Sequence, residues 1–256
     1  MAYLPISTPG EVGGPDGYSY GALVLMTDAA DAAALERVLR VIRFTGWIAP
    51  AASGTQIVVG DPGAGVVAAG RRGIIEVGAV VAEQLDCAVL AVRVRRDRQL
   101  GLVAWRGAEE IGRYDSDPSA EPGADDDVAS ELVGVAAAPG FAALAGVPTA
   151  GETLTEILDE ELERDSVSES ERLRGILRLL SLPDWIVASS SLPRDIPTGP
   201  RAADLIRLRG GMPGACGIWR GLALRRLRRR WTPPPIIADP PRESGQGLEG
   251  IEPWMF

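Results

Sequence analysis

Two carboxylates at the end of a predicted strand are the first residues in this sequence that could do chemistry. Asp115 and Asp117 follow the short run Glu110 to Tyr114 and come directly before Pro118. Closely spaced carboxylates can hold a hard cation such as Mg²⁺ or Ca²⁺, or divide general acid and base work between them. Asp and Pro also favour turns, so an ordinary turn is the alternative interpretation. We therefore treat Asp115 and Asp117 as a candidate metal site.

The second candidate is the Arg-rich stretch from Trp219 to Trp231. Clustered Arg residues bind anionic groups through a planar fork of donors, and Trp favours interfaces. An acidic protein or a second copy of this chain could bind here, or the Arg residues could pair with acids of the same chain. A membrane surface is a further alternative, whereas the net charge of −9 disfavours nucleic acid. The candidate partner-binding residues are Arg225, Arg226, Arg228, Arg229, Arg230 and Trp231.

The absence of three residue types excludes large classes of enzyme mechanism. All 26 basic residues are Arg, and the chain contains no Lys, His or Asn. Without His there is no Ser-His-Asp or Cys-His pair, and without Lys there is no P-loop lysine or Schiff base. Cys87 and Cys216 are too few to form a zinc site with soft ligands. We expect no cofactor, and the composition favours a protein that is not an enzyme.

Composition also bears on the source and the compartment. Lys, His and Asn have A-rich or AT-leaning codons, so their absence indicates a GC-rich genome. The first residues lack a basic region followed by an apolar core, so no signal peptide is visible. The uncharged run from Leu132 to Gly151 contains Pro139 and Pro148, which break a membrane-spanning helix. We expect a cytoplasmic protein.

The stretch from Asp86 to Pro118 should hold the centre of a sheet. Its two Val- and Leu-rich runs, Ala88 to Val94 and Leu100 to Trp105, are separated by a charged turn, which is typical of a hairpin. Upstream, the run from Tyr18 to Met26 predicts a buried strand, and two shorter extended pieces lie between Trp47 and Val59.

Two amphipathic helices are predicted between these strands. The first carries Leu35, Val38, Leu39 and Ile42 at helical spacing, and the second carries Ile74, Ile75, Val77, Val81 and Leu85. The resulting order of strands and helices predicts an α+β fold. It should have a mainly antiparallel sheet with two helices on one face, followed by a helical C-terminal region and a Pro-rich tail.

Helices are also predicted beyond Pro118, two of them introduced by a capping box, in which a hydroxyl and a carboxylate satisfy backbone amides. Thr149 and Glu152 form the first box, and Ser168 and Glu171 form the second. The apolar positions that follow are Leu154, Ile157, Leu158 and Leu162, then Leu173, Ile176, Leu177 and Leu180. The segment from Ala202 to Leu208 predicts a last short helix.

Charge divides the chain into segments. The stretch from Asp115 to Glu171 holds 16 acidic residues and one Arg, whereas Arg201 to Arg230 hold nine Arg residues and one acid. We predict a flexible tail at 1–17, an α+β sheet domain at 18–118, an acidic loop and helical region at 119–200, and an Arg-rich segment with a Pro-rich tail at 201–256.

Two stretches carry a resemblance to known proteins. They read LAVRVRRDRQLGLVAWRGAEEIGRYDSDP and SERLRGILRLLSLPDWI, and there the chain resembles uncharacterised hypothetical proteins of actinobacteria. Its plan is loosely similar to that of the small acidic immunity proteins that neutralise bacterial toxins, from which the basic, Pro-rich C-terminal part departs.

The lack of His and Lys, together with the segregation of charge, favours a non-enzymatic cytoplasmic protein that binds another protein in a regulatory or immunity-like role. One alternative is a carboxylate-dependent, metal-binding hydrolase that uses Asp115 and Asp117. Another is peripheral attachment to a membrane or to nucleic acid through the Arg-rich segment.

Overall fold

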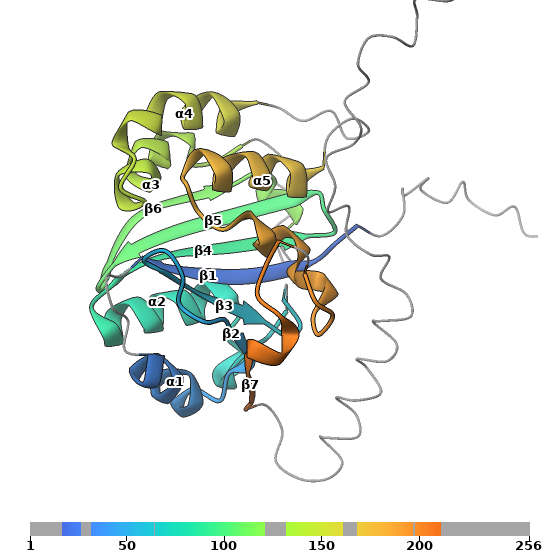
Figure 1. The fold of residues 1–256 in the computed structure, drawn as a ribbon. Coiled ribbons are helices and arrows are strands. Elements are labelled where there is room, and N and C mark those ends of the chain that lie inside the picture. Colours follow the sequence, from blue (N-terminus) through green and yellow to red (C-terminus); the bar gives the residue numbers. More distant parts are fainter. Residues whose placement is uncertain are drawn as a thin grey trace, which may run out of the picture.

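The computed structural model describes residues 17–26, 32–63, 65–120, 132–160, 168–196 and 198–210. Among these residues, seven antiparallel strands form one sheet in the order β6-β5-β4-β1-β3-β2-β7, with helices on both faces (Figure 1). The strands are β1 (Tyr20–Met26), β2 (Thr45–Ile48), β3 (Thr55–Gly60), β4 (Ala88–Arg95), β5 (Gln99–Arg106), β6 (Glu109–Asp115) and β7 (Ile206–Arg209). The α-helices are α1 (Ala32–Val41), α2 (Ile74–Leu85), α3 (Ala138–Leu144), α4 (Gly151–Asp159) and α5 (Glu169–Leu179). The 3₁₀ helices are η1 (Ala69–Arg71), η2 (Pro118–Ala120), η3 (Val135–Ala137), η4 (Pro148–Ala150), η5 (Asp184–Ser191) and η6 (Ala202–Asp204).

The predicted hairpin is the pair β4 and β5, which are hydrogen-bonded along their whole length. Its turn places Arg96 and Asp97 in the left-handed region, at φ angles of 49° and 58°. Most side chains of both strands are buried, because helices cover both faces of the sheet. The third predicted run pairs with β5 as β6.

Helices α1 and α2 cover one face of the sheet (Figure 1). Their buried residues follow helical spacing, with Leu35 and Leu39 in α1 and Ile74, Val77 and Val81 in α2 among them. They pack against strand residues that share this face. The predicted α+β class, with two helices on one face of an antiparallel sheet, is therefore confirmed.

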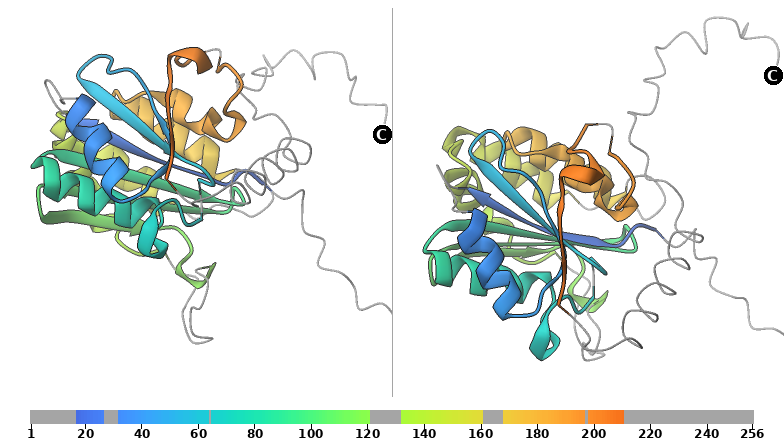
Figure 2. Two further views of the ribbon diagram at one scale, coloured as in Figure 1. Left: turned by 90° about the horizontal axis from the view of Figure 1, so that it is seen from below. Right: turned by 60° about the horizontal axis from the view of Figure 1, so that its bottom comes forward.

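The opposite face is covered by α3, α4, α5 and η5, so the sheet lies between two helical layers (Figure 2). One hydrophobic cluster combines the strand residues Val24 and Val92 with Leu154 of α4 and Leu173 and Ile176 of α5. The described parts of the predicted segments 18–118 and 119–200 thus share one core.

The last described strand corrects the predicted helix at Ala202 to Leu208. Only a single 3₁₀ turn forms there, and the following residues form β7, which pairs antiparallel with β2. Leu205 and Leu208 are spaced as on a helix, but Leu205 joins the core on the α5 side and Leu208 joins the core on the α1 side. Ile206 and Leu208 alternate with Arg207 and Arg209, a period of two that suits a strand.

The predicted N-cap at Ser168 is present, and the one at Thr149 is not. Ser168 caps α5, because its hydroxyl oxygen accepts a hydrogen bond of 3.3 Å from the amide of Glu171. Thr149 does not cap α4, so that prediction is wrong. Thr149 lies inside η4, which begins at Pro148, and α4 continues from this turn with Ala150 at its N-cap position. Pro148 therefore starts the helical turn before Thr149 can serve as a cap.

The uncharged run from Leu132 to Gly151 contains η3, α3 and η4 in place of one long helix. Ala138, Phe141 and Ala142 of α3 are buried against the sheet, which accounts for the apolar character of this run. No helix in the described part of the chain has the length and hydrophobicity needed to span a membrane.

Candidate functional site

The candidate carboxylate Asp115 is the last residue of β6 and is held by several donors. Its Oδ1 and Oδ2 accept hydrogen bonds of 2.9 and 3.1 Å from Nε2 of Gln99. Oδ1 also accepts a hydrogen bond of 3.0 Å from the amide of Asp117, and Nη2 of Arg93 lies 3.7 Å from Oδ2. The side chain of Asp115 is 18% exposed, so most of its hydration is replaced by these protein donors.

The second candidate carboxylate, Asp117, lies in the turn after β6. Its Oδ1 accepts a hydrogen bond from the hydroxyl of Ser119, and its backbone carbonyl accepts one of 2.8 Å from Nε2 of Gln99. The structure thus brings Asp115 and Asp117 into one turn, around one amide side chain. Within the described ranges, no group of three or more His, Cys, Asp or Glu side chains is placed to share a metal ion. A cation held by Asp115 and Asp117 stays a prediction.

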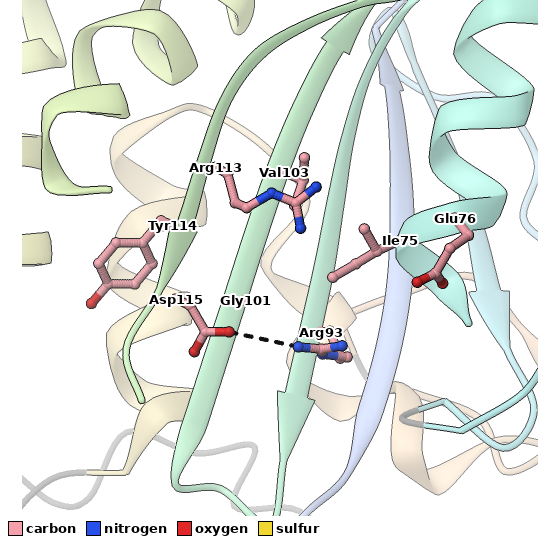
Figure 3. Close-up of a pocket in the computed structure, with 8 residues that line it drawn as sticks. All are labelled: Ile75, Glu76, Arg93, Gly101, Val103, Arg113, Tyr114 and Asp115. Carbon is pink, nitrogen blue, oxygen red and sulfur yellow. Dashed lines mark ion pairs between the residues drawn. The ribbon is translucent and has the colours of Figure 1, made fainter. Parts of the chain in front are cut away.

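A pocket of about 280 Å³ lies beside Asp115, between α2 and the strands β5 and β6 (Figure 3). The charged ends of Arg93, Arg113 and Asp115 point toward it, whereas the ring of Tyr114 points away. A ligand in this pocket would therefore meet charges of both signs. The lining residues are Ile75, Glu76, Arg93, Gly101, Val103, Arg113, Tyr114 and Asp115.

The two Arg residues of this pocket are engaged in ion pairs. Arg113 donates from Nε and Nη2 to the two carboxylate oxygens of Glu110, at 3.1 and 3.0 Å. This hydrogen bonding raises the pKa of Arg113, although partial burial lowers it. Arg93 is paired with Asp115, as described above. The pocket can hold a polar group by hydrogen bonds, and its lining offers no Ser, Thr or Cys nucleophile.

On the other face of the sheet, a buried polar cluster joins β6 to α5. Arg172 donates a hydrogen bond of 2.7 Å from Nη1 to the hydroxyl oxygen of Tyr114, and its Nη2 donates to the carbonyl of Glu160. The hydroxyl of Tyr114 in turn donates to the carbonyl of Leu158 at 3.1 Å. Nη1 of Arg172 also lies 3.5 Å from Oε1 of Glu169. We call Tyr114, Glu169 and Arg172 the buried polar cluster.

Glu169 is the carboxylate of the buried polar cluster, and its burial disfavours the charged form. Its side chain is 6% exposed, and its Oε2 accepts no hydrogen bond from the described residues. Burial raises the pKa of Glu169, and this effect exceeds the lowering by a hydrogen bond from Ser116 and by the charge of Arg172. The nearby carboxylates of Asp97 and Asp115 raise the pKa further. The protonated form is therefore favoured more strongly than in an exposed Glu.

The hairpin turn between β4 and β5 anchors the start of α5. The carboxylate of Asp97 accepts a hydrogen bond of 2.8 Å from the amide of Ser170, and its carbonyl accepts one of 3.2 Å from the amide of Glu169. The hydroxyl of Tyr20 donates to Oγ of Ser170 at 2.9 Å. These contacts satisfy amides in the first turn of the helix and place a negative charge at its positive end.

Sequence reasoning did not single out the buried polar cluster. Glu169 and Arg172 are three residues apart in α5 and lie on the face that also carries Leu173 and Ile176. A helical wheel drawn from the Ser168 cap would have placed both charged residues on this apolar face. An unpaired charge on an apolar helix face is costly, so the presence of two opposite charges there could have predicted a buried ion pair.

The edge of the sheet at β7 is basic, and we call Arg43, Arg207 and Arg209 the basic edge. Strand β7, coloured orange, is the last strand at this end of the described sheet, beyond β2 (Figures 1 and 2). The guanidinium carbon of Arg207 lies 5.8 Å from the ring centroid of Trp47. Arg209 and Arg43 are exposed, and the amide of Gly210 donates a hydrogen bond to the carbonyl of Phe44 beside them.

The predicted partner-binding residues Arg225, Arg226, Arg228, Arg229, Arg230 and Trp231 lie outside the described residues, as does Cys216. The described cysteine, Cys87, is half-buried, and burial raises the pKa of its thiol. Comparisons with protein-family models, with curated proteins and with solved structures find no match to this chain.

Proposed function

We propose that this protein is a non-enzymatic cytoplasmic protein that binds another protein, in a regulatory or immunity-like role, and that the partner presents acidic residues. The observation that supports this proposal is the basic edge. Strand β7 ends the described sheet and carries Arg207 and Arg209, with Ile206 exposed at 42%. A strand at the end of a sheet is a template for pairing with another chain. Arg suits such a contact, because its planar fork of donors matches a carboxylate.

Three charged residues of the sites described above favour this surface indirectly. Asp115 accepts hydrogen bonds that close the end of β6, and Glu169 and Arg172 are enclosed between α5 and the sheet. These residues therefore serve the fold. Arg43 and Arg209, in contrast, are exposed to solvent, where a partner can reach them.

Positive charge also continues along the chain from this surface. The sequence after β7 contains the Arg-rich stretch from Trp219 to Trp231. An acidic partner would be attracted by the charges of the basic edge, and the sequence that follows carries further positive charge. Such attraction increases the rate of association and weakens as salt is added.

The test is purification of the full chain from its source cells at low and at high salt, with identification of any stoichiometric companion. The companion is then produced alone and titrated against the purified chain by calorimetry. We expect an acidic protein that binds more tightly at low salt. If purified chain has no stoichiometric companion at either salt concentration, the proposal is wrong.

A matched pair of variants tests the surface. Arg209→Glu should weaken binding of the companion, because it places a carboxylate on the basic edge. Arg201→Glu makes the same change of charge at an exposed residue before β7, and it should have a smaller effect. Equal effects of the two variants would argue for attraction by net charge alone.

A further inference from the structure

We propose that the pocket beside Asp115 binds a small zwitterion, namely a free amino acid with a short aliphatic side chain. The ligand's carboxylate contacts Arg113, and its ammonium group contacts Glu76. This inference goes beyond the proposed function, because it concerns a small ligand and does not depend on a protein partner. It is carried by the walls of the pocket, by a glycine in its floor and by two opposite charges that face across it.

Two different walls enclose the pocket. Helix α2 packs on β1, β4 and β5, whereas β6 lies beyond β5 at the end of the described sheet. Arg113 and Asp115 of β6 point to the α2 side, because Tyr114 between them belongs to the core on the α5 side. The wall on the β6 side is therefore charged, and the opposite wall is formed by Ile75 and Glu76 of α2 (Figure 3).

Gly101 of β5 lies in the floor between the two walls. It pairs in regular register with Arg93 of β4 and with Asp115 of β6, so it does not mark a bulge. A Cβ atom at Gly101 would lie 3.5 Å from Nη2 of Arg93 and 3.8 Å from Cδ1 of Ile75, which is ordinary van der Waals contact. Packing would therefore accept alanine here. A glycine inside a regular strand without a packing reason is typical of a place where a ligand approaches the backbone closely.

Arg113 keeps a donor for a ligand on the β6 side. Its Nε and Nη2 donate to Glu110, whereas its Nη1 donates to no group in the described part of the chain. The guanidinium points toward the pocket (Figure 3). The pairing with Glu110 orients the guanidinium without using all of its donors, because a guanidinium has five N–H groups. A ligand carboxylate can therefore accept a hydrogen bond from Nη1.

Glu76 supplies the opposite charge from the α2 side. It is exposed, and its side chain forms no hydrogen bond or ion pair with other residues that the structure describes. Hydrogen bonding to Glu110 is the main cause of the raised pKa of Arg113, and the charge of Glu76 also raises it. Glu76 and Arg113 therefore lie near each other without direct contact. A ligand with two opposite charges can bridge them.

A zwitterion matches this pocket better than a ligand with one kind of charge. An anion would also face the two carboxylates of the pocket, and a cation would face its two guanidinium groups. Like charges brought together in this way oppose binding. The volume of about 280 Å³ is at the lower end for ligand pockets, which suits a molecule as small as an amino acid. Ile75 and Val103 add an apolar surface for a short aliphatic side chain.

The first experiment titrates the isotope-labelled full chain with L-valine and follows the backbone amides by NMR. N-acetyl-L-valine lacks the ammonium charge and L-valinamide lacks the carboxylate, so they are matched control ligands. L-valine should shift the amides of Gly101, Val103 and Arg113. Each control ligand should bind at least about fivefold more weakly. No shift of these amides at about 20 mM L-valine would overturn the inference, and so would equally tight binding of either control ligand.

The second experiment tests the two charges with matched variants. Glu76→Gln should weaken binding of L-valine by about fivefold and leave that of N-acetyl-L-valine unchanged. Its control is Glu83→Gln, at an exposed position of the same helix outside the pocket. Arg113→Gln should weaken L-valine to a similar extent and leave L-valinamide unchanged, with Arg106→Gln at an exposed position of β5 as its control. If each variant acts no more strongly than its control, net charge alone is recognised and the inference is wrong.

Gly101→Ala tests the pocket without a change of charge. The added methyl group occupies the floor at van der Waals distance from its neighbours, so it should weaken binding of L-valine without lowering the melting temperature. Gly175→Ala is the control, because a Cβ atom at Gly175 of α5 would meet no atom within 4 Å and this residue does not line the pocket. If folded Gly101→Ala binds L-valine as tightly as the wild type, the ligand does not lie over Gly101 and the inference is overturned.

Discussion

Nη1 of Arg172 lies 2.7 Å from the hydroxyl oxygen of Tyr114, which places a guanidinium of α5 against the buried face of β6. The same nitrogen is 3.5 Å from the carboxylate of Glu169, and the side chain of Arg172 is only 2% exposed. The contact between the sheet and α5 is therefore built on a buried ion pair, with a phenol as its third member. Removing one partner of such a pair leaves an uncompensated buried charge.

Arg172→Met is expected to lower the free energy of unfolding by about 3–5 kcal/mol, because Glu169 would stay buried without its cation. Urea denaturation measures this change. Arg178→Met is the control, because Arg178 pairs with Asp184 on the surface and its side chain is 51% exposed. It should cost no more than about 1 kcal/mol. If Arg172→Met proves as mild as the control, the buried ion pair does not hold α5 in place.

The pH dependence of stability should report on Glu169. Burial raises the folded pKa of Glu169 above its value of about 4.3 in the unfolded chain. The contribution of this group to the free energy of unfolding is then fully present below about pH 4 and is lost as the pH rises through the folded pKa. Replacing Glu169 by Gln removes this dependence. The stability of the wild type relative to Glu169→Gln should therefore decrease as the pH rises from about 4 toward 7.

The control for this measurement is Glu156→Gln, which changes an exposed carboxylate on α4 in the same way. Its stability relative to the wild type should change little with pH. Urea denaturation at several pH values gives both comparisons. A constant difference between the wild type and Glu169→Gln would mean that burial does not govern this carboxyl group.

The two sequence-predicted helix starts provide a matched pair of cap variants. Ser168→Ala should destabilise the protein by about 0.5–2 kcal/mol, because the amide of Glu171 loses its acceptor. Thr149→Ala should change stability by less than about 0.5 kcal/mol, because Thr149 is exposed inside η4 and makes no cap. Thermal unfolding of both variants measures the contrast. Equal losses would place a cap at Thr149 after all.

Much of the fold could be predicted from local patterns. The hairpin of β4 and β5, the strand β1 and the buried faces of α1, α2 and α5 all lie where hydrophobic periodicity places them. The segment from Ala202 to Leu208 was assigned wrongly, because Leu205 and Leu208 have helical spacing. The strand β7 forms there because β2, far away in the sequence, supplies its partner. The alternation of Ile206 and Leu208 with Arg residues was a local signal for a strand, but the pairing with β2 leaves no such signal.

The candidate site was predictable only in part. The turn that contains Asp115 and Asp117 follows from the residues themselves, but Gln99, which binds both of them, comes from the start of the preceding strand. The buried polar cluster combines β6 with α5, two elements that are separated by the acidic region. Sequence spacing cannot show which distant elements meet. The contact between Tyr114 of β6 and Arg172 of α5 could therefore not be derived from the sequence.

The two candidate carboxylates should differ sharply in their contribution to stability. Asp115→Ala removes one acceptor of Gln99, the acceptor of the Asp117 amide and an ion-pair partner of Arg93, whose side chain is 13% exposed. Leaving a donor such as the Asp117 amide without its acceptor costs about 1–3 kcal/mol. The carboxylate of Asp117 accepts a hydrogen bond only from Ser119 among the contacts that the structure describes, so Asp117→Ala should cost less than about 1 kcal/mol.

The same two variants test the predicted cation site. Because the oxygens of Asp115 already accept hydrogen bonds from Gln99 and Asp117, a cation would have to displace these donors in order to bind. We therefore expect calorimetric titration of the wild type with Mg²⁺ and Ca²⁺ to show no heat of binding. A heat of binding that both Asp115→Ala and Asp117→Ala abolish would instead establish a cation site. In that case the hydrogen bonds around Asp115 would belong to the metal-free state alone.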